Sequence, residues 1–381
     1  MNTAKIPGKP HLVISGYYGF DNAGDEAILL SLVTAFRTIC PEVQLTVLSS
    51  NPSNTANLYH VQALNRWQPG EVYRALREAD MLVSGGGSLL QDVTGLKSLV
   101  YYLGVVWLAL KLKKPVGFCG QGVGPVTSGI GRRLMKSIAD KVDLITVRDE
   151  QSANDLLEMG ITSPPVYVTA DPVFVLKKND FSPEQENKFL QSPHQDNQSG
   201  KVQSTAGISI REWSLFNEKD QLVVAKLADH LSDSGWQIIF LPFHYPTDFT
   251  ACLRVKQLMK SPAQVIDKVL TAREAGSIIG SLDLLIGMRL HSLILAAVAG
   301  VPFIGISYDP KIKRFLNQLG LHPAGEASSL EYSKCLSAVN EVISNQDAFK
   351  NKIWRAVEIL QPKALLNARL ALELAGTLKE S

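Results

Sequence analysis

Short apolar runs alternate along this chain with longer amphipathic stretches such as residues 24–38 and 129–141. Apolar runs of about four to eight residues, separated by helical patterns, are typical of a parallel sheet with helices on both faces. The runs that predict strands are residues 11–15, 44–48, 81–85, 115–120, 144–148, 166–170, 206–210, 236–243, 283–287 and 301–307.

The alternation breaks at residues 177–205, which are polar and rich in Gln, Asn and Ser. Such a composition predicts a linker or insertion. It separates an N-terminal domain, residues 1–176, from a C-terminal domain, residues 206–346. Residues 347–381 carry no strand pattern and predict helices with a break at Pro362.

Together these patterns predict an α/β protein with two doubly wound, Rossmann-like domains that face a cleft, followed by a helical C-terminus. This is the GT-B architecture. Ligands of doubly wound sheets bind beyond the carboxyl ends of the strands. The residues at those ends are therefore the first candidates for chemistry.

Composition narrows the function classes. The chain has 381 residues, of which 45% are hydrophobic and 19% charged, and its net charge is +2. No Lys/Arg-rich block of the kind that binds nucleic acid is present, so we expect no nucleic-acid partner. No HxH or HExxH pair occurs among the histidines, and we expect no metal site. The four cysteines are dispersed and predict small core residues in a reducing compartment: Cys40, Cys119, Cys252 and Cys335.

The chain shows no secretory or membrane-spanning signal. No hydrophobic signal region precedes the first predicted strand. The apolar part of residues 99–114 is shorter than the roughly 20 residues that span a bilayer. It is interpreted as a core helix, with a membrane-facing patch as the alternative. We expect a cytoplasmic protein.

Arg289 and His291 follow the predicted strand 283–287, before a helix that is expected to begin near Ser292. The N-terminus of a helix attracts anions, and an arginine adds bidentate recognition of phosphate or carboxylate. The alternative is structural: Arg289 pairs with a carboxylate of the protein, and His291 caps the helix.

Two further arginines stand at strand ends: Arg148 is the last residue of 144–148, and Arg211 is the last residue of 207–211. Arginines at strand ends of both domains favour a cleft for a multiply charged anion. Each of them could instead form a structural ion pair, and for Arg211 the neighbouring Glu212 is the candidate partner.

Lys311 falls in the first turn of a helix that Asp309 caps and Pro310 opens. The helix dipole disfavours a cation at that position. A ligand would explain the lysine, and so would a solvated surface position.

The loop after the first strand, residues 16–29, contains Asn22, Asp25 and Glu26. The two acids fall in a first helical turn, where helix capping explains them. Carboxylates also bind sugar hydroxyls, and we therefore place this loop on the acceptor side as the second interpretation.

Other strand ends carry weaker signals. Residues 84–92, which include Gly86, are expected to turn from a strand into a helix and to let a ligand approach the backbone. His244 follows the strand 236–243. The glycines of residues 120–125 do not form the dinucleotide fingerprint.

Several of these segments form an ordered set. GYYGFDNAGDEAIL, SGGGSLLQD, GQGVGP, ISIREW, LPFH, GMRLHSLI and SYDPKI follow one another here. In this order they resemble polysaccharide pyruvyltransferases of the CsaB type, which act on cell-wall or cell-surface polysaccharides. The resemblance covers about residues 12 to 320. It implies a GT-B-like fold and a transfer of pyruvate from phosphoenolpyruvate to a sugar as a ketal, without a cofactor.

The resemblance also implies residue roles. The RLH motif, here Arg289, Leu290 and His291, contacts the donor, and its histidine is the favoured acid or base. Lys311 and Arg148 are linked to donor binding or catalysis. From the residues themselves we add Arg211 to the donor set. The acceptor set that we expect is Asn22, Asp25, Gly86 and His244.

The expected partners are phosphoenolpyruvate and a saccharide or lipid-linked saccharide. A lipid-linked acceptor would bring the protein into peripheral contact with the cytoplasmic face of the plasma membrane.

Two other functions are considered. A nucleotide-sugar glycosyltransferase of the same fold often carries a glutamate that holds the ribose, but Leu295 occupies that position here. A non-catalytic saccharide-binding protein has little need for the set Arg289, His291 and Lys311, because a neutral glycan carries no charge for such groups to recognise.

Overall fold

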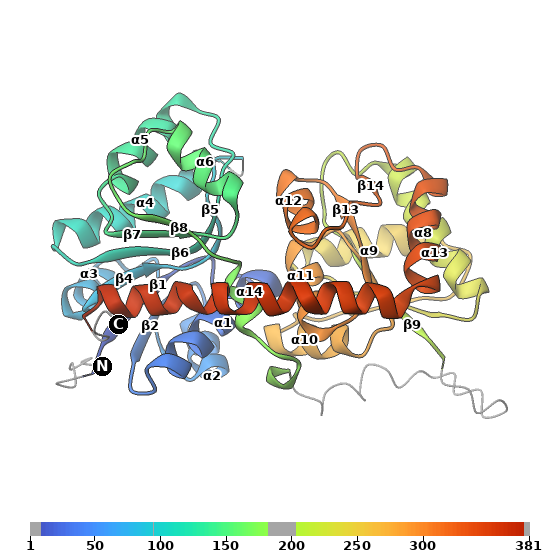
Figure 1. Cartoon of the computed structure of the whole chain (residues 1–381), viewed down its shortest axis with the longest axis horizontal. Coiled ribbons are helices and arrows are strands. Elements are labelled where there is room, and N and C mark those ends of the chain that lie inside the picture. Colours follow the sequence, from blue (N-terminus) through green and yellow to red (C-terminus); the bar gives the residue numbers. More distant parts are fainter. Residues whose placement is uncertain (1–8, 94, 182–202, 377–381) are drawn as a thin grey trace. The chain divides into compact units, whose positions relative to one another are not determined.

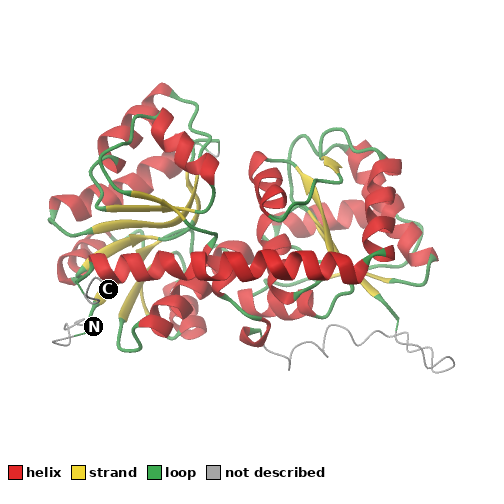
Figure 2. Cartoon of the chain, in the orientation of Figure 1, coloured by secondary structure: helices red, strands yellow, loops and turns green. Residues whose placement is uncertain are grey.

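The computed structural model describes residues 9–93, 95–181 and 203–376, and the chain divides into two compact units (Figure 1). Unit 1 comprises Met1–Phe20, Ile28–Val175 and Ile359–Ser381, and unit 2 comprises Asp21–Ala27 and Leu176–Glu358. In each unit, helices surround a central sheet (Figure 2).

The sheet of unit 1 is entirely parallel, with the order β3-β2-β1-β4-β6-β7-β8, and β5 pairs with β6. The strands are β1 (His11–Ser15), β2 (Gln44–Ser49), β3 (Gln62–Asn65), β4 (Met81–Ser84), β5 (Gly87–Leu90), β6 (Val116–Val123), β7 (Leu144–Val147) and β8 (Val166–Val168). The chain moves outward from β1 to β3 and then returns to the other side of β1. The sheet is therefore doubly wound, with a switch point between β1 and β4.

The helices of this unit bury one face against the sheet. In α4, Leu99, Leu103 and Val106 are buried, at the spacing of one helical face. Side chains at the N-caps fix where helices begin: Asp149 accepts from the backbone of Ser152 at the start of α6. The helices are α1 (Ala23–Ile39), α2 (Pro52–Tyr59), α3 (Pro69–Glu78), α4 (Leu96–Lys111), α5 (Gly129–Ala139) and α6 (Glu150–Glu158).

Unit 2 repeats the design with the strand order β11-β10-β9-β12-β13-β14, again all parallel. Its switch point lies between β9 and β12. The strands are β9 (Thr205–Ser209), β10 (Gln237–Phe240), β11 (Gln264–Val265), β12 (Leu284–Gly287), β13 (Phe303–Ser307) and β14 (Gly325–Glu326). The helices are α8 (Glu218–Asp233), α9 (Thr247–Leu258), α10 (Ala272–Gly280), α11 (Leu290–Ala299), α12 (Pro310–Gln318), α13 (Tyr332–Ser344) and, as far as Glu358, α14 (Gln346–Leu374).

The predicted α/β class, the doubly wound sheets and all the predicted strands are confirmed. The pattern missed β3, β5, β11 and β14, which are short and lack a continuous apolar run. The prediction for residues 84–92 is wrong in one respect. The chain forms β5 there, and a helix begins only at Leu96.

The predicted break at Pro362 is also wrong, because α14 runs through this residue. The helix from Ile359 onward belongs to unit 1 instead of forming a separate C-terminal element. Its anchor there is Asn367, whose side chain accepts from Thr169 Oγ1 at 2.7 Å and donates to the Ala170 carbonyl at 3.1 Å. These tertiary bonds hold a helix across a residue that locally disfavours one.

Of the polar segment 177–205, residues 182–202 lie outside the described residues, so the linker stays a prediction. Three cysteines are buried core residues as predicted, and Cys40 is only partly buried. In the part of the chain that the structure describes, each helix is either too short or too polar to cross a bilayer.

Candidate functional site

Four predicted site residues lie just beyond the carboxyl ends of strands in unit 2. Arg211 follows β9, His244 follows β10, Arg289 follows β12 and Lys311 follows β13. Because the strands are parallel, these ends share one edge of the sheet, and β9 and β12 flank its switch point. The fold therefore collects them where a doubly wound sheet binds ligands.

Arg289 is fixed by a carboxylate that the sequence pattern did not reveal. Its Nε donates to Oδ2 of Asp248 at 2.7 Å, and its Nη2 donates to Oδ1 at 2.6 Å. Asp248, in α9, is completely buried and also accepts from the backbone N–H groups of Glu212 and His244. The predicted alternative of a structural carboxylate partner is thus present. One buried aspartate ties together the loops after three strands.

Burial alone would lower the pKa of Arg289, but the Asp248 carboxylate outweighs it and holds that pKa above its ordinary value. The guanidinium is therefore permanently charged and oriented. Asp248 takes up its Nε and Nη2 groups, so Nη1 remains the nitrogen that can meet a ligand.

Arg211 has a different environment. Its Nη1 donates to the Tyr308 hydroxyl at 2.6 Å, and its guanidinium lies 4.6 Å from the centre of that ring. Glu212, the predicted partner, forms its ion pair with Arg254 instead. Within the described ranges no carboxylate pairs with Arg211. It is the cation of this group that is best placed to attract an external anion.

Lys311 approaches the same aromatic ring, with Nζ 5.5 Å from the centre of Tyr308. Asp309 caps α12, as predicted, by accepting from the backbone of Lys311, and its Oδ2 lies 3.3 Å from Nζ. Burial raises the pKa of Asp309, but Lys311 and the cap bond overcome this and lower that pKa below its usual value. The Lys311 side chain is only 21% exposed, which argues against the solvated surface position.

His291 occupies the second position of α11, whose N-cap is Arg289. The predicted capping role for His291 is therefore wrong. Instead, the imidazole packs against the backbone of Gly24. A Cβ atom on Gly24 would lie 2.6 Å from Nδ1 of His291, so only glycine fits there. Leu290, between the two, is buried in the first turn.

The segment Asp21–Ala27 belongs to unit 2, although the predicted boundaries put it in the N-terminal domain. The Ala23 N–H donates to the Phe243 carbonyl at 2.8 Å, and Asn22 forms an antiparallel bridge with His244. The expected acceptor residues Asn22 and His244 therefore lie beside the expected donor residues, within one unit. These bonds join segments that are far apart in the sequence, and a local pattern therefore could not predict them.

Asn22 organises this segment. Its Oδ1 accepts from the Gly24 N–H at 3.1 Å, and its Nδ2 donates to Oδ2 of Asp25 at 2.6 Å. Asn22 is therefore the side chain that caps the start of α1, while Asp25 is held by Asn22.

Burial lowers the pKa of His244, and the Arg289 guanidinium lowers it further, although Asp248 opposes both. At neutral pH the imidazole is therefore uncharged and can accept a proton. This is a chemical property that the sequence position alone did not give.

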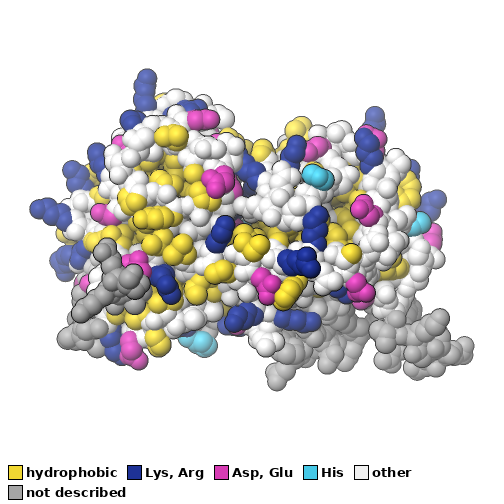
Figure 3. Space-filling model, viewed as in Figure 1, with side chains coloured by type: hydrophobic (Ala, Val, Ile, Leu, Met, Phe, Trp, Pro, Cys, Tyr) yellow, Lys and Arg dark blue, Asp and Glu magenta, His cyan; other side chains and the backbone are white. Residues whose placement is uncertain are grey.

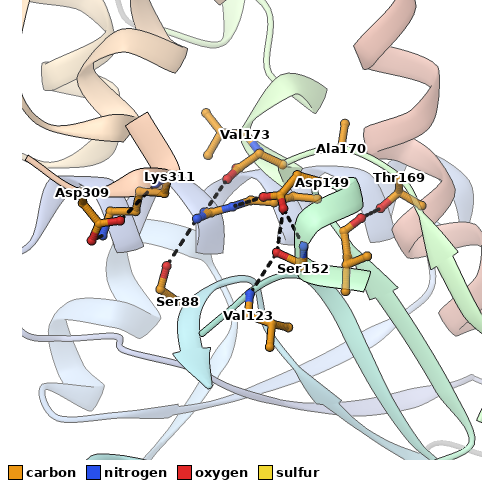
Figure 4. A network of polar contacts seen from close by, with 12 residues as sticks. Ser88, Val123, Asp149, Ser152, Thr169, Ala170, Val173, Asp309 and Lys311 are labelled. Atoms are coloured by element: carbon orange, nitrogen blue, oxygen red, sulfur yellow. Dashed lines mark hydrogen bonds and ion pairs between the residues drawn. The ribbon is translucent and has the colours of Figure 1, made fainter. Parts of the chain in front are cut away.

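Arg148 belongs to unit 1, where it is buried. Two of its partners, Ser88 and Asp149, are labelled in Figure 4. Arg148 Nη1 donates to Oδ2 of Asp171 at 3.1 Å, its Nη2 donates to Oγ of Ser88 at 3.3 Å, and its Nε lies 3.6 Å from Asp149. A side chain on Gly122 would collide with this guanidinium. The structural ion pair considered for Arg148 is therefore present. That Arg148 shares a ligand with the residues of unit 2 stays a prediction.

Gly86 is buried and tightly packed. A Cβ atom there would lie 3.1 Å from Cγ of Pro172 and 3.2 Å from the Cys119 carbonyl oxygen. Packing therefore explains this glycine, and its acceptor role stays a prediction.

The sequence pattern missed Asp248, Tyr308, Asp171 and Ser88 as partners of the arginines. Tyr308 could have been noticed, because it directly precedes the Asp-Pro-Lys motif. Nothing in the local sequence distinguishes Asp248 from any other acid in a first helical turn.

A family model described as polysaccharide pyruvyl transferase matches residues 22–310 of this chain. The chain belongs to the polysaccharide pyruvyl transferase family. The predicted resemblance is thereby confirmed, and the protein is an enzyme of the class that transfers pyruvyl groups to polysaccharide. The amylovoran biosynthesis protein AmsJ of Erwinia amylovora is 25% identical over 299 residues, which cover 74% of this chain and 70% of AmsJ.

Solved structures share the fold at low identity. The MnaA–UDP complex of S. aureus superposes with a TM-score of 0.66, 11% identity and 98% coverage of both chains. A glycosyltransferase from Rickettsia africae gives a TM-score of 0.64, 13% identity, and 96% and 99% coverage. A UDP-GlcNAc 2-epimerase from Neisseria meningitidis, bound to UDP-GlcNAc, gives 0.61, 14%, and 96% and 99%. These likenesses confirm the predicted GT-B fold of this pyruvyltransferase.

Proposed function

We propose that the protein transfers pyruvate from phosphoenolpyruvate to a saccharide and forms a cyclic pyruvate ketal. The observation that carries this proposal is the group at the strand ends of unit 2, where Arg211 has no carboxylate partner among the described residues and Arg289 is held in place by Asp248. Phosphoenolpyruvate bears a phosphate and a carboxylate on a three-carbon frame. Oriented guanidinium groups recognise both anions through paired hydrogen bonds.

The cations of the site are not equivalent. Arg289 and Lys311 each have an aspartate partner, whereas among the described residues the side chain of Arg211 bonds the Tyr308 phenol and no carboxylate. We assign Arg211 to the primary anion contact, and the free Nη1 edge of Arg289 to the second. Lys311 binds or stabilises the departing phosphate when its contact with Asp309 is exchanged for one with the ligand.

The reaction requires a proton at the methylene carbon of the donor. Protonation makes the adjacent carbon electrophilic, and one sugar hydroxyl attacks it. The bond from this carbon to the phosphate oxygen then breaks, and a second hydroxyl closes the ketal. Two carbon–oxygen bonds and one carbon–hydrogen bond form, while the carbon–carbon π bond and one carbon–oxygen bond break. The proton lost by the first hydroxyl replaces the one delivered to the methylene carbon, and the proton of the second hydroxyl leaves with phosphate.

His291 is the proposed general acid toward the methylene carbon, a role worth about 10²–10⁴ in rate. Its contact with the Gly24 backbone restricts where the imidazole can lie. His244, uncharged at neutral pH, is the proposed base for the acceptor hydroxyl. Asn22 lies beside His244 and bonds Asp25, and these two residues would bind the remaining hydroxyls.

Arg148 is proposed as a further donor or catalytic residue, as the family motif implies. Its contacts with Asp171 and Ser88 would hold the guanidinium in one orientation. The acceptor is proposed to be a polysaccharide repeat or its lipid-linked precursor at the cytoplasmic face of the membrane. No cofactor takes part in these steps.

A nucleotide-sugar transferase is the competing function for this fold. The position that would hold the ribose is Leu295, which is completely buried in α11 and cannot accept a hydrogen bond. We therefore retain the pyruvyl transfer.

Mass spectrometry of saccharides incubated with the enzyme and phosphoenolpyruvate tests the proposal directly. We expect a pyruvyl adduct together with stoichiometric phosphate. The His291→Ala variant should lose at least about a hundredfold in phosphate release. If this variant keeps wild-type turnover, His291 is not the general acid. If the enzyme transfers a sugar from a nucleotide sugar and no pyruvyl group from phosphoenolpyruvate, the proposed donor is wrong.

A further inference from the structure

Helix α4 of unit 1 has an outward stripe that the sheet does not cover. Its exposed residues are spaced alternately by three and four, which places them on one helical face, opposite the buried Leu99, Leu103 and Val106. Val100 is 47% and Trp107 50% exposed, and Nζ of Lys111 lies 5.7 Å from the Trp107 ring centre. We call this set the α4 stripe: Lys97, Val100, Gly104, Trp107 and Lys111.

The segment that carries the stripe has charges of one sign. Residues 93–139 include seven lysines and arginines and no aspartate or glutamate, although the whole chain has a net charge of only +2. Helix α5 packs against α4, so its basic residues lie on the same side of the sheet. Lys and Arg side chains gather along this rim of unit 1 in Figure 3. The exposed lysines and arginines of residues 93–139 are Lys97, Lys111, Lys113, Arg132, Arg133 and Lys136, and of these Lys136 pairs with Asp140 at 3.9 Å.

An exposed tryptophan among lysines, without any acid nearby in the sequence, fits a particular partner. Tryptophan is favoured at the level of lipid headgroups, where its ring is apolar and its N–H is hydrated. Lysines extend their charged ends toward headgroup phosphates while their stems cover apolar surface. A helix with such a face lies in the plane of the membrane interface.

We propose that the α4 stripe docks unit 1 on an anionic lipid surface. The charge complementarity favours this partner over a second copy of the chain, because two copies of the stripe would bring like charges together. This docking rests on the proposed function and extends it. A lipid-linked acceptor is confined to the membrane surface, so an enzyme that docks there meets its acceptor. It also revises the sequence interpretation, since α4 is a core helix on one face and an exposed surface on the other.

The test uses the full chain and vesicles, without phosphoenolpyruvate or saccharide, so that transfer activity plays no part. We expect co-sedimentation with vesicles that contain phosphatidylglycerol, little with phosphatidylcholine alone, and release by added salt. Trp107→Ala and Lys111→Gln should each weaken binding about fivefold or more. The matched control is Trp354→Ala, which removes a tryptophan of similar exposure, 59%, from α14 and should bind like wild type.

The double variant Lys97→Gln/Lys111→Gln changes only exposed polar groups. It therefore tests the stripe even where Trp107→Ala loses binding because it misfolds. All variants should keep their thermal midpoint and their phosphate release with a soluble acceptor. Wild-type chain that stays unbound at low salt overturns the docking surface, and so does undiminished binding of Trp107→Ala together with the double variant. If the stripe variants instead lose self-association in light scattering while their lipid binding is unchanged, the stripe is a contact between copies of the chain.

Discussion

Gly24 and His291, which lie far apart in the sequence, are in direct contact. The Gly24 backbone lies so close to the imidazole that a Cβ atom would sit 2.6 Å from Nδ1. Gly24 is at the start of α1, next to Asn22 and Asp25, and His291 is at the start of α11. One backbone position thereby joins the proposed acceptor segment to the proposed acid.

Gly24→Ala should impair catalysis because the added methyl group must displace His291. A shift of about 1 Å in a catalytic group can lower the rate about a hundredfold. We expect kcat to fall by about that factor, measured by phosphate release, with a smaller change in thermal stability. Gly70→Ala is the control, since a Cβ atom there meets nothing within 4 Å. Equal activity of the two variants would contradict the contact.

Asp248→Asn should destabilise unit 2 strongly. The substitution leaves the Arg289 charge buried without its carboxylate, and breaking a buried ion pair in this way costs about 3–5 kcal/mol. Denaturant unfolding measures the loss. Asp309→Asn is the control, because that pair with Lys311 is partly exposed and asparagine caps helices well; its cost should stay below about 1 kcal/mol. Similar costs for both would show that Asp248 is not the organising carboxylate.

Arg211→Gln should weaken donor binding and leave folding intact. Charge-assisted hydrogen bonds contribute about 1.5–3 kcal/mol, so we expect KM for phosphoenolpyruvate to rise about ten- to a hundredfold. Arg254→Gln serves as the control, because Arg254 pairs with Glu212 and is 40% exposed. An unchanged KM in Arg211→Gln would remove Arg211 from the donor site.

His244 should make stability depend on pH. Its pKa in the folded state is below the ordinary value of about 6.5, so the unfolded chain takes up the proton first as the pH falls. The contribution of His244 is complete above that ordinary value and is lost as the pH falls toward the folded-state pKa.

Unfolding curves at several pH values should therefore show a loss of stability on acidification that is reduced in His244→Gln. His322→Gln, at an exposed histidine, should keep the wild-type pH dependence. If His244→Gln also keeps it, the pKa of His244 is not lowered by its surroundings.

The sequence by itself determined the local features of this protein. Apolar runs gave the strands, Asp309 and Pro310 gave the start of α12, and the ordered motifs gave the family. Such features depend on neighbours along the chain, where backbone propensity and side-chain periodicity act directly.

Only the tertiary structure decided which groups face one another. Asp248 bonds Arg289 across 41 residues, Arg211 selects Tyr308 over the adjacent Glu212, and Gly24 touches His291. Pro362 remains helical because Asn367 bonds the sheet of unit 1. Burial and charge between segments distant in sequence fix these pairs, and no pattern confined to one segment contains that information.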